Sequence, residues 1–436
     1  MKRRKTLITG TVIAIMAGAG IIAAMACLLD FNDNKIIDHF YKAPGDQMFY
    51  ISSPAIDGDG NIYIGTSHKG RWEIEGNTWS EHYYMLSFNP DLSPRWSFQT
   101  NNSELIKGGP AIHPSGLIIF VVESNGPSSS QSIPNATYNK VYALNMDGTL
   151  NWSSAHLNED VFDSAWGSSP LHPAIDDNGN IHVQGQHVIS CFHSNGTLYW
   201  ENRTSILNYA GSPTVHGNTV YFPSGDTNNG YIYAFHLNGT FKWRFTAHEP
   251  ACNNRFNMIS IDGDGRLIAG MDNETVHAIN SNGTLNWTFT IPTSNAKVRQ
   301  NVAIDDTGTI YLGTKNDQHS EFYALHANGS LKWKYSNPLR DVYSSPTLTT
   351  DGSIWFGTED MAIYRLDMET GDLLDTFQVE RDITWCSPAF TASGTLLAGD
   401  MGGYLYAIDF QGIGLATGFA WPCLGFNFQR TRYVSG

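Results

Sequence analysis

The chain has 436 residues, enough for one large β-domain or two ordinary domains. Charged residues make up only 15% of it, against ~25% in an average domain, while Gly, Trp and Tyr are abundant. This composition favours a sheet protein with many tight turns, and the net charge of −15 would repel phosphate backbones, so we expect no nucleic-acid partner.

The first predicted element is an uncharged stretch from Thr6 to Leu29, which follows a basic cytoplasmic tip at residues 1–5. Its length suits a membrane-spanning hydrophobic helix better than a signal-peptide core of ~7–15 residues. The basic end should stay in the cytoplasm and send the rest of the chain outside. Three alternatives remain open: an uncleaved anchor, a signal cleaved after Ala26, and a lipid anchor on Cys27.

Residues 30–47 show no repeat and are predicted to be a linker. From residue 48 onward a motif of an apolar strand, a Gly turn and a second strand recurs eight times, and in six of the copies a Pro, usually after a small residue, precedes the first strand. Its copies cover 52–66, 108–122, 172–185, 211–224, 257–271, 300–314, 344–358 and 386–400. Each copy is followed by two further strands, which in most copies flank an Asn-Gly or Asp-Gly hairpin turn.

Each repeat is therefore a unit of four short strands, A to D. One such unit cannot bury its faces alone, whereas eight arranged radially can. The sequence predicts an all-β, eight-bladed β-propeller of four-stranded antiparallel blades over residues 48–420, with a closing tail at 421–436. The alternative fold, two β-sandwiches, would not explain why all eight repeats share the same order of strands and turns. We expect the propeller to be monomeric.

A tryptophan recurs at one position of strand D in the first six blades. We expect these side chains to wedge between adjacent blades and to be structural; they are Trp96, Trp152, Trp200, Trp243, Trp287 and Trp333. Blade seven has Asp375 or Thr376 near this place, and blade eight has Thr417. We therefore expect the last two joints to be weaker.

The combination of "YAL" with "DGTLNW" resembles the pyrroloquinoline-quinone (PQQ) repeat, over about 48–419. Proteins built from this repeat are eight-bladed propellers similar to quinoprotein alcohol dehydrogenases. The resemblance implies one of two functions. Some members are dehydrogenases that bind the quinone and calcium, whereas others are non-catalytic scaffolds, such as the lipoprotein of the outer-membrane β-barrel assembly machinery. Fold alone does not decide between them.

Antiparallel strand order places the A–B and C–D turns on one face, the turn face, and the B–C and D–A connections on the other, the loop face. The longer and more variable connections, at 68–83, 123–139, 153–168 and 247–256, all belong to the loop face. Variable loops on a rigid scaffold commonly carry binding sites. We therefore expect a partner to bind the loop face, through blades one to three.

An arginine precedes strand A in four consecutive blades, and aromatic residues accompany these positions. The candidate ligand or partner rim is Arg255, Arg299, Arg340, Arg381, Trp166, Tyr343 and Trp385. Such a ring around the central channel would suit an anion or carboxylate. The alternative is that the arginines are solvated loop charges paired with neighbouring aspartates.

The sequence gives little support to an enzyme. It has no adjacent cysteine pair, and no compact set of acidic and amide residues marks a calcium site on the loop face. "DGDGN" at 57–61 resembles part of a calcium loop but is interpreted as a hairpin turn. We expect no catalytic residues, no metal, and neither PQQ nor calcium as a cofactor; a PQQ-dependent dehydrogenase with an Arg-lined pocket is the rival hypothesis.

Four C–D turns are also glycosylation sequons, at Asn195, Asn238, Asn282 and Asn328. Because Asn-Gly is itself a strong hairpin signal, turn chemistry alone could produce these sequons. The cysteines are scattered, so spacing assigns no disulfide, and Cys191 is expected to be a buried thiol. Together these features predict a membrane-anchored, extracytoplasmic propeller, at the cell surface or in the periplasm, that binds a protein partner.

Overall fold

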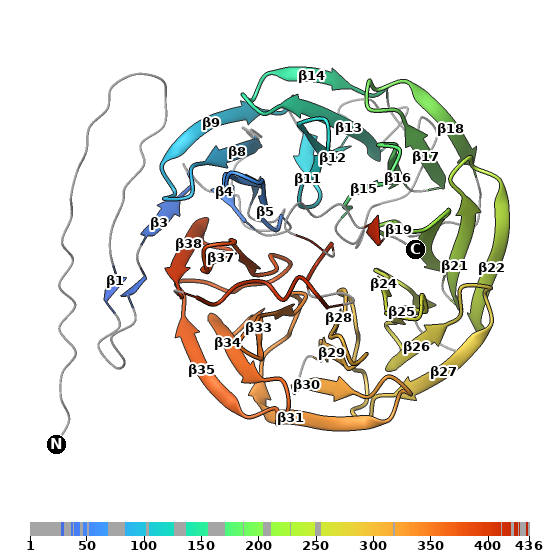
Figure 1. Cartoon of the computed structure of the whole chain (residues 1–436), viewed down its shortest axis with the longest axis vertical. Coiled ribbons are helices and arrows are strands. Elements are labelled where there is room, and N and C mark those ends of the chain that lie inside the picture. Colours follow the sequence, from blue (N-terminus) through green and yellow to red (C-terminus); the bar gives the residue numbers. More distant parts are fainter. Residues whose placement is uncertain are drawn as a thin grey trace, which may run out of the picture.

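The computed structural model describes residues 41–43, 47–49, 52–68, 83–101, 104–125, 137–155, 171–185, 187–203, 211–226, 228–248, 254–316, 319–410, 412–419, 423–425 and 427, and the backbone of strands at 28–29, 36–37, 39–40 and 433–434. These residues form eight four-stranded antiparallel sheets arranged in a ring, so the predicted eight-bladed propeller is confirmed (Figure 1). The described part of the chain contains no helix.

The first four blades follow the chain order. Blade 1 contains β5 (Ala55–Ile56), β6 (Ile62–Gly65), β8 (Tyr84–Phe88) and β9 (Pro94–Gln99); blade 2 contains β11 (Ala111–His113), β12 (Leu117–Asn125), β13 (Thr137–Asn145) and β14 (Leu150–Ser153); blade 3 contains β15 (Ala174–Ile175), β16 (Ile181–Gly185), β17 (Val188–Phe192) and β18 (Leu198–Arg203); and blade 4 contains β19 (Thr214–His216), β20 (Thr219–Asp226), β21 (Asn229–His236) and β22 (Phe241–His248).

The remaining blades complete the ring. Blade 5 contains β24 (Ser260–Ile261), β25 (Leu267–Gly270), β26 (Thr275–Ile279) and β27 (Leu285–Thr290); blade 6 contains β28 (Ala303–Ile304), β29 (Ile310–Gly313), β30 (Ser320–Leu325) and β31 (Leu331–Leu339); blade 7 contains β32 (Thr347–Leu348), β33 (Ser353–Thr358), β34 (Ala362–Asp367) and β35 (Leu373–Gln378); and blade 8 contains β36 (Ala389–Phe390), β37 (Thr395–Gly399), β38 (Tyr404–Asp409) and β3 (His39–Lys42).

Short strands extend this framework. They are β1 (Leu28–Leu29) paired with β2 (Ile36–Ile37), β4 (Gln47–Met48) paired with β7 (Ser67–His68), β10 (Glu104–Ile106) on β12, β23 (Asn254–Arg255) on β20, and β39 (Tyr433–Val434) on β19. The hydrophobic helix predicted for 6–29 lies outside the described residues except for its last two positions, which form β1. No helix of the described part is long and apolar enough to cross a membrane.

The outer strand of blade 8 corrects two of the predictions. It is β3, from within the 30–47 segment that was predicted to be a linker, and it pairs antiparallel with β38 (Figure 1). Thr417 does not occupy the strand D position; its segment returns to blade 7, where Leu415 bridges Thr349. An N-terminal strand in the last blade joins the two ends of the ring through hydrogen bonds, which is why the repeat at the C-terminus stops at three strands.

Strand D tryptophans lie at six of the eight blade seams. The Trp200 indole donates to the carbonyl of Leu237 in the next blade at 2.7 Å, and its ring covers Gly239, where a Cβ atom would lie 2.7 Å from the ring. Trp96, Trp152, Trp243, Trp287 and Trp333 make the same bond to Met146, Ser194, Ser281, Ala327 and Met368. In each of these C–D turns only glycine suits the position, because the backbone adopts a left-handed φ and the tryptophan ring occupies the space of a Cβ atom.

The other two seams are filled differently. Between blades 7 and 8, Trp355 is fully buried and packs on Phe377, Phe390 and Phe410. Between blades 8 and 1 the described residues place no tryptophan, and the C–D turn of blade 1 carries Leu92 at φ 60° where the next six blades have Gly. Leu92 is 2% exposed and lies in one apolar cluster with Tyr41 and Phe88, so it fills the space of the missing ring.

The inner strands are joined by the small residues that precede proline. The Ser387 amide donates to Ser53 Oγ across the 8–1 seam, and the Ser345 amide donates to Ser387 Oγ across the 7–8 seam, both at 2.8 Å. These bonds explain the recurrence of Ser-Pro before strand A. The chain then ends on the turn face, where β39 pairs with β19 of blade 4, across the ring from β38.

Candidate functional site

The described part of the loop face is formed mainly by blades 5–8. Most residues of the long connections at 68–83, 123–139, 153–168 and 247–256, and Trp166 among them, lie outside the described residues. In blades 5, 7 and 8 the B–C connections are tight turns, as at Thr358–Ala362. The predicted rim on these blades can therefore be located residue by residue.

Two of the predicted rim arginines bind one carboxylate. Arg299 makes a bidentate pair with Asp272, with Nη2 at 2.9 Å from Oδ2, and Arg255 Nε lies 3.4 Å from the same oxygen. Asp272 comes from the B–C turn of blade 5, and all three side chains are largely buried. Burial disfavours the Arg299 charge, but the bond to Asp272 outweighs it, and the net effect raises the pKa of Arg299.

The other two arginines, Arg340 and Arg381, are exposed. They lie in the D–A connections of blades 6–7 and 7–8, and both act electrostatically on Asp382. Burial nevertheless raises the pKa of Asp382. The four arginines thus form no single ring: two belong to an internal ion pair in blade 5, and two face solvent over blades 7 and 8.

An aromatic pair lies on the same two blades. The rings of Tyr343 and Trp385 are 4.9 Å apart at an angle of 39°, and both side chains are only partly buried. Burial raises the pKa of the Tyr343 hydroxyl to about 12, so it is neutral at physiological pH. Tyr, Trp and Arg are the residue types most enriched among the energetically dominant residues of protein interfaces.

Glu359, in the B–C turn of blade 7, is a carboxyl that the sequence did not single out. Burial raises its pKa to about 7, and the neighbouring carboxylates Asp341 and Asp382 add to this effect, whereas Lys315 and Arg340 oppose it. Asp341 itself pairs with Lys315 at 3.3 Å and accepts a bond from Ser320 Oγ. This part of the loop face therefore changes its charge near neutral pH.

A cavity of about 430 Å³ opens beside this cluster, where blades 7 and 8 meet the N-terminal strands. Its lining combines thioethers with both signs of charge: Lys42, Gln47, Met48, Met361, Glu380, Arg381, Asp382, Met401, Gly402 and Tyr404. Met361 is 43% exposed and adopts φ 59° at a turn position where blade 8 has Gly403.

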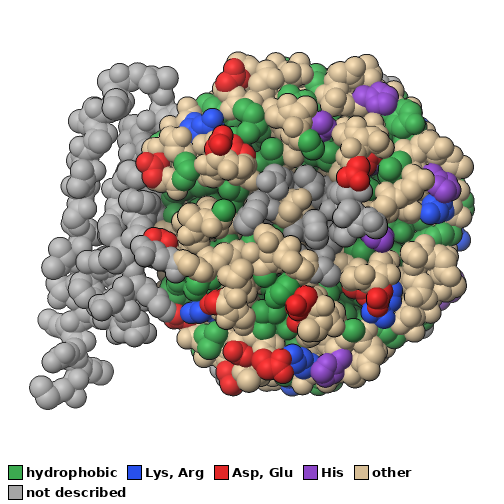
Figure 2. Space-filling view, in the orientation of Figure 1, with side chains coloured by type: hydrophobic (Ala, Val, Ile, Leu, Met, Phe, Trp, Pro, Cys, Tyr) green, Lys and Arg blue, Asp and Glu red, His purple; other side chains and the backbone are tan. Residues whose placement is uncertain are grey.

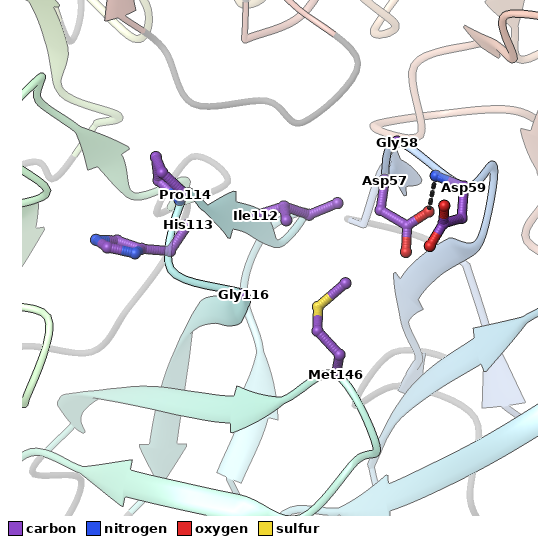
Figure 3. Close-up of a pocket in the computed structure, with 8 residues that line it drawn as sticks. All are labelled: Asp57, Gly58, Asp59, Ile112, His113, Pro114, Gly116 and Met146. Carbon is purple, nitrogen blue, oxygen red and sulfur yellow. Dashed lines mark hydrogen bonds between the residues drawn. The ribbon is translucent and has the colours of Figure 1, made fainter.

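A second cavity of about 430 Å³ lies on the turn face, between blades 1 and 2 (Figure 3). In it, Asp57 accepts bonds from the amides of Asp59 and Asn61 and from the Tyr63 hydroxyl at 2.7 Å. His113 points away from Asp57 and donates from Nε2 to the Gly179 carbonyl at 2.9 Å. The Asp57 carboxylate thus stabilises its own hairpin turn, as the interpretation of "DGDGN" requires.

The sequon asparagines are exposed on the turn face. Each Oδ1 accepts a bond from the hydroxyl two residues later, at 2.7–2.8 Å, in Asn195, Asn238, Asn282 and Asn328. Their exposure leaves glycosylation as a prediction. The three described cysteines beyond the N-terminus, Cys191, Cys386 and Cys423, are buried free thiols, and burial raises the pKa of Cys191.

Charged side chains are scattered singly over the face that Figure 2 shows, without one large patch. Within the described residues, no three His, Cys, Asp or Glu side chains are grouped to hold a metal.

A family model described as outer membrane protein assembly factor BamB matches residues 138–294 and 272–412, more than half of the chain. The chain belongs to this family. Its fold is similar to the crystal structure of BamB from Moraxella catarrhalis, with 15% identity and a TM-score of 0.59 over 85% of this chain and 98% of that one.

Two further structures share the BamB-family fold. A europium-containing methanol dehydrogenase has 12% identity and a TM-score of 0.59 over 85% of this chain and 92% of that chain. A computationally designed protein, Ika8, has 10% identity and a TM-score of 0.57 over 85% and 98%. Comparison with curated proteins finds no match. At these identities the structures show the fold alone.

Proposed function

We propose that this propeller is a membrane-tethered, extracytoplasmic scaffold that binds a protein partner on its loop face and catalyses no reaction. The observation that carries the proposal is the division of the four arginines. Asp272 pairs with both Arg255 and Arg299 beside blade 5, whereas Arg340 and Arg381 face solvent beside the Tyr343–Trp385 pair.

The pairing of Arg255 and Arg299 with Asp272 argues against a quinone cofactor. A cluster of arginines around the channel could clamp the carboxylates of PQQ only if their guanidinium groups were available to it. The Asp272 carboxylate already binds Arg299 through two bonds and lies 3.4 Å from Arg255. This pairing supports a propeller without a PQQ cofactor, and the proposal assigns no redox step to the chain.

The solvent-facing arginines and the aromatic pair beside them support protein binding. Trp385, Tyr343, Arg340 and Arg381 lie on adjacent blades, and Trp, Tyr and Arg are the residue types enriched at the centres of protein interfaces. The cavity beside them is lined by Met48, Met361 and Met401, whose flexible thioethers adapt to varied apolar partners. We therefore place the partner on blades 7 and 8, in addition to the loops of blades one to three.

The family supports the proposed location. The matching model is named for an outer-membrane assembly factor, and the basic tip followed by the uncharged 6–29 stretch is typical of an exported chain.

Photocrosslinking tests the proposal. A photoreactive amino acid is placed at Trp385 on the loop face or at Asn328 on the turn face, in the full chain in its native membrane. We expect a discrete protein adduct from position 385 and none from 328. Adducts from 328 alone, or from neither position together with quinone-dependent activity, would refute it.

A further inference from the structure

Exposed apolar side chains of the described residues are concentrated on one edge of the propeller. Nine large hydrophobic side chains are more than 40% exposed, and eight of them occupy the first or second position of an outer strand, directly after a C–D turn. They are Leu150, Leu198, Tyr199, Phe241, Leu285, Leu331, Leu373 and Leu374. Only Met361 lies on the loop face. An apolar arrangement repeated on one edge indicates a surface that meets an apolar environment.

Blades 3–6 carry the C–D turns with the least charge, while the A–B turns on the same face include the exposed Asp177, Asp264 and Asp306. Their C–D turns read SNGT, LNGT, SNGT and ANGS, without a charged residue, whereas blade 2 has Asp147 and blade 7 has Glu369 and Asp372. We call Leu198, Tyr199, Phe241, Leu285 and Leu331 the turn-face rim. Neutral turns lower the desolvation cost of moving this rim out of water. Aromatic residues and leucine beside a lysine, here Lys242, are also characteristic of a membrane–water interface.

The path of the N-terminus leads to the same face. In β3, His39 pairs with Ala407 and Lys42 with Tyr404, while the B–C turn of blade 8 immediately precedes Tyr404. The chain therefore enters β3 at the turn-face end. Residues 30–38 span at most about 30 Å when extended, so a membrane anchor in the 6–29 stretch would be within about 30 Å of this end of β3.

The two features lie on opposite sides of the ring. The N-terminal chain joins blade 8, and the turn-face rim belongs to blades 3–6, across the disc (Figure 1). We infer that the turn face rests on the lipid surface, held by the anchor at blade 8 and by the turn-face rim opposite, so that the loop face points away from the bilayer toward its partner. This inference rests on the membrane tether of the proposed function.

The same turns contain the predicted sequons, and the two uses exclude each other. Asn195 is three residues from Leu198, and Asn282 is three residues from Leu285. A glycan at these positions would hold the rim in water. Lipid docking therefore requires unmodified asparagines, and the Asn-Gly turns are then explained by the tryptophans that cover their glycines.

Spin labelling in phosphatidylcholine vesicles tests the inference. Neutral lipid is chosen because the chain is acidic. One label is attached through Leu285→Cys on the rim and, in a matched chain, another through Met361→Cys on the loop face; these side chains are 50% and 43% exposed. Cys27 and Cys252 are replaced by Ser in both chains, and the buried Cys191, Cys386 and Cys423 are retained. Collision rates with oxygen and with a water-soluble nickel complex report lipid or water.

On reconstitution of the full chain, the oxygen-to-nickel ratio at position 285 should rise several-fold, while that at 361 stays unchanged. In a chain that also carries Leu198→Ser, Phe241→Ser and Leu331→Ser, the ratio at 285 should return toward its aqueous value. A chain that floats with vesicles but keeps a water-exposed label at 285 overturns only the docking. If the natural chain, with Cys27 intact, does not float either, the tether is overturned as well. A lipid-exposed label at 361, or a glycan on Asn282 of the natural protein, also refutes the inference.

Discussion

The contact between tryptophan and glycine at the blade seams leads to a quantitative prediction. In Gly239→Ala, the new Cβ would lie 2.7 Å from two ring atoms of Trp200, at φ 84°. In the control, Gly352→Ala, φ is 78° and no atom lies within 4 Å of the new Cβ. Both changes incur the left-handed backbone penalty of roughly 1–2 kcal/mol. Only Gly239→Ala also overpacks a seam, which typically costs 1–3 kcal/mol, so we expect it to be more destabilising by about 1–3 kcal/mol.

Urea unfolding followed by tryptophan fluorescence and circular dichroism measures this difference, with equal m values as the condition for comparing the two chains. The double variant Trp200→Leu/Gly239→Ala provides the second control, because a smaller side chain leaves room for the methyl group. Its loss of stability should be less than the sum of the two single losses. Equal effects of the two alanines, or strict additivity in the double variant, would refute the claim that the ring requires this glycine.

Further variants test other parts of the structure. Leu92→Gly empties part of the 8–1 seam but relieves the left-handed backbone penalty at φ 60°, so we expect a net loss of roughly 1–3 kcal/mol in urea unfolding; unchanged or increased stability would contradict this. Asp272→Asn leaves Arg255 and Arg299 without their carboxylate and should cost roughly 3 kcal/mol at pH 7, seen as a lowered Tm, and a neutral effect would show that the pair is not internal. Burial raises the pKa of Glu359 from its ordinary value of 4.5 to about 7 in the folded protein, so its contribution to stability is complete below pH 4.5 and is lost as the pH rises through 7. Glu359→Gln should therefore stabilise the protein by about 1–2 kcal/mol at pH 8, allowing for its partial exposure, with little effect at pH 4; the opposite pH trend would be inconsistent with a raised pKa. With the photoreactive amino acid moved to position 340, Trp385→Ala should weaken crosslinking to the partner at least about tenfold without lowering Tm, because Trp385 is only partly buried; unimpaired crosslinking would move the interface elsewhere.

The fold was predictable because its information is local and repeated. The hairpin turns occur at the same position in all eight repeats, and in many of them Ser-Pro precedes strand A or a tryptophan lies in strand D. Eight copies of the repeat therefore predict eight blades. The outer strand of blade 8 was not predictable in this way, because β3 is separated from its blade by almost the whole chain and has neither a neighbouring hairpin turn nor a tryptophan. Leu92 was missed for a related reason, since its role depends on the absence of a ring from β3.

The candidate site was predictable only in part. The repeat placed the four arginines on the loop face, but it did not show that a carboxylate from a B–C turn, Asp272, would bind Arg255 and Arg299. That pairing depends on how neighbouring blades are rotated against each other. The aromatic pair Tyr343–Trp385 could be named from its position before strand A, whereas the raised pKa of Glu359 depends on burial and on three-dimensional neighbours.

Calorimetric titration of the full chain with PQQ, with and without Ca²⁺, followed by a dye-reduction assay, tests the central claim most directly. A non-catalytic scaffold with Arg255 and Arg299 bound to Asp272 predicts no saturable binding and no dye reduction under either condition. Tight calcium-dependent binding accompanied by dye reduction would contradict the account and identify the chain as a quinone-dependent enzyme.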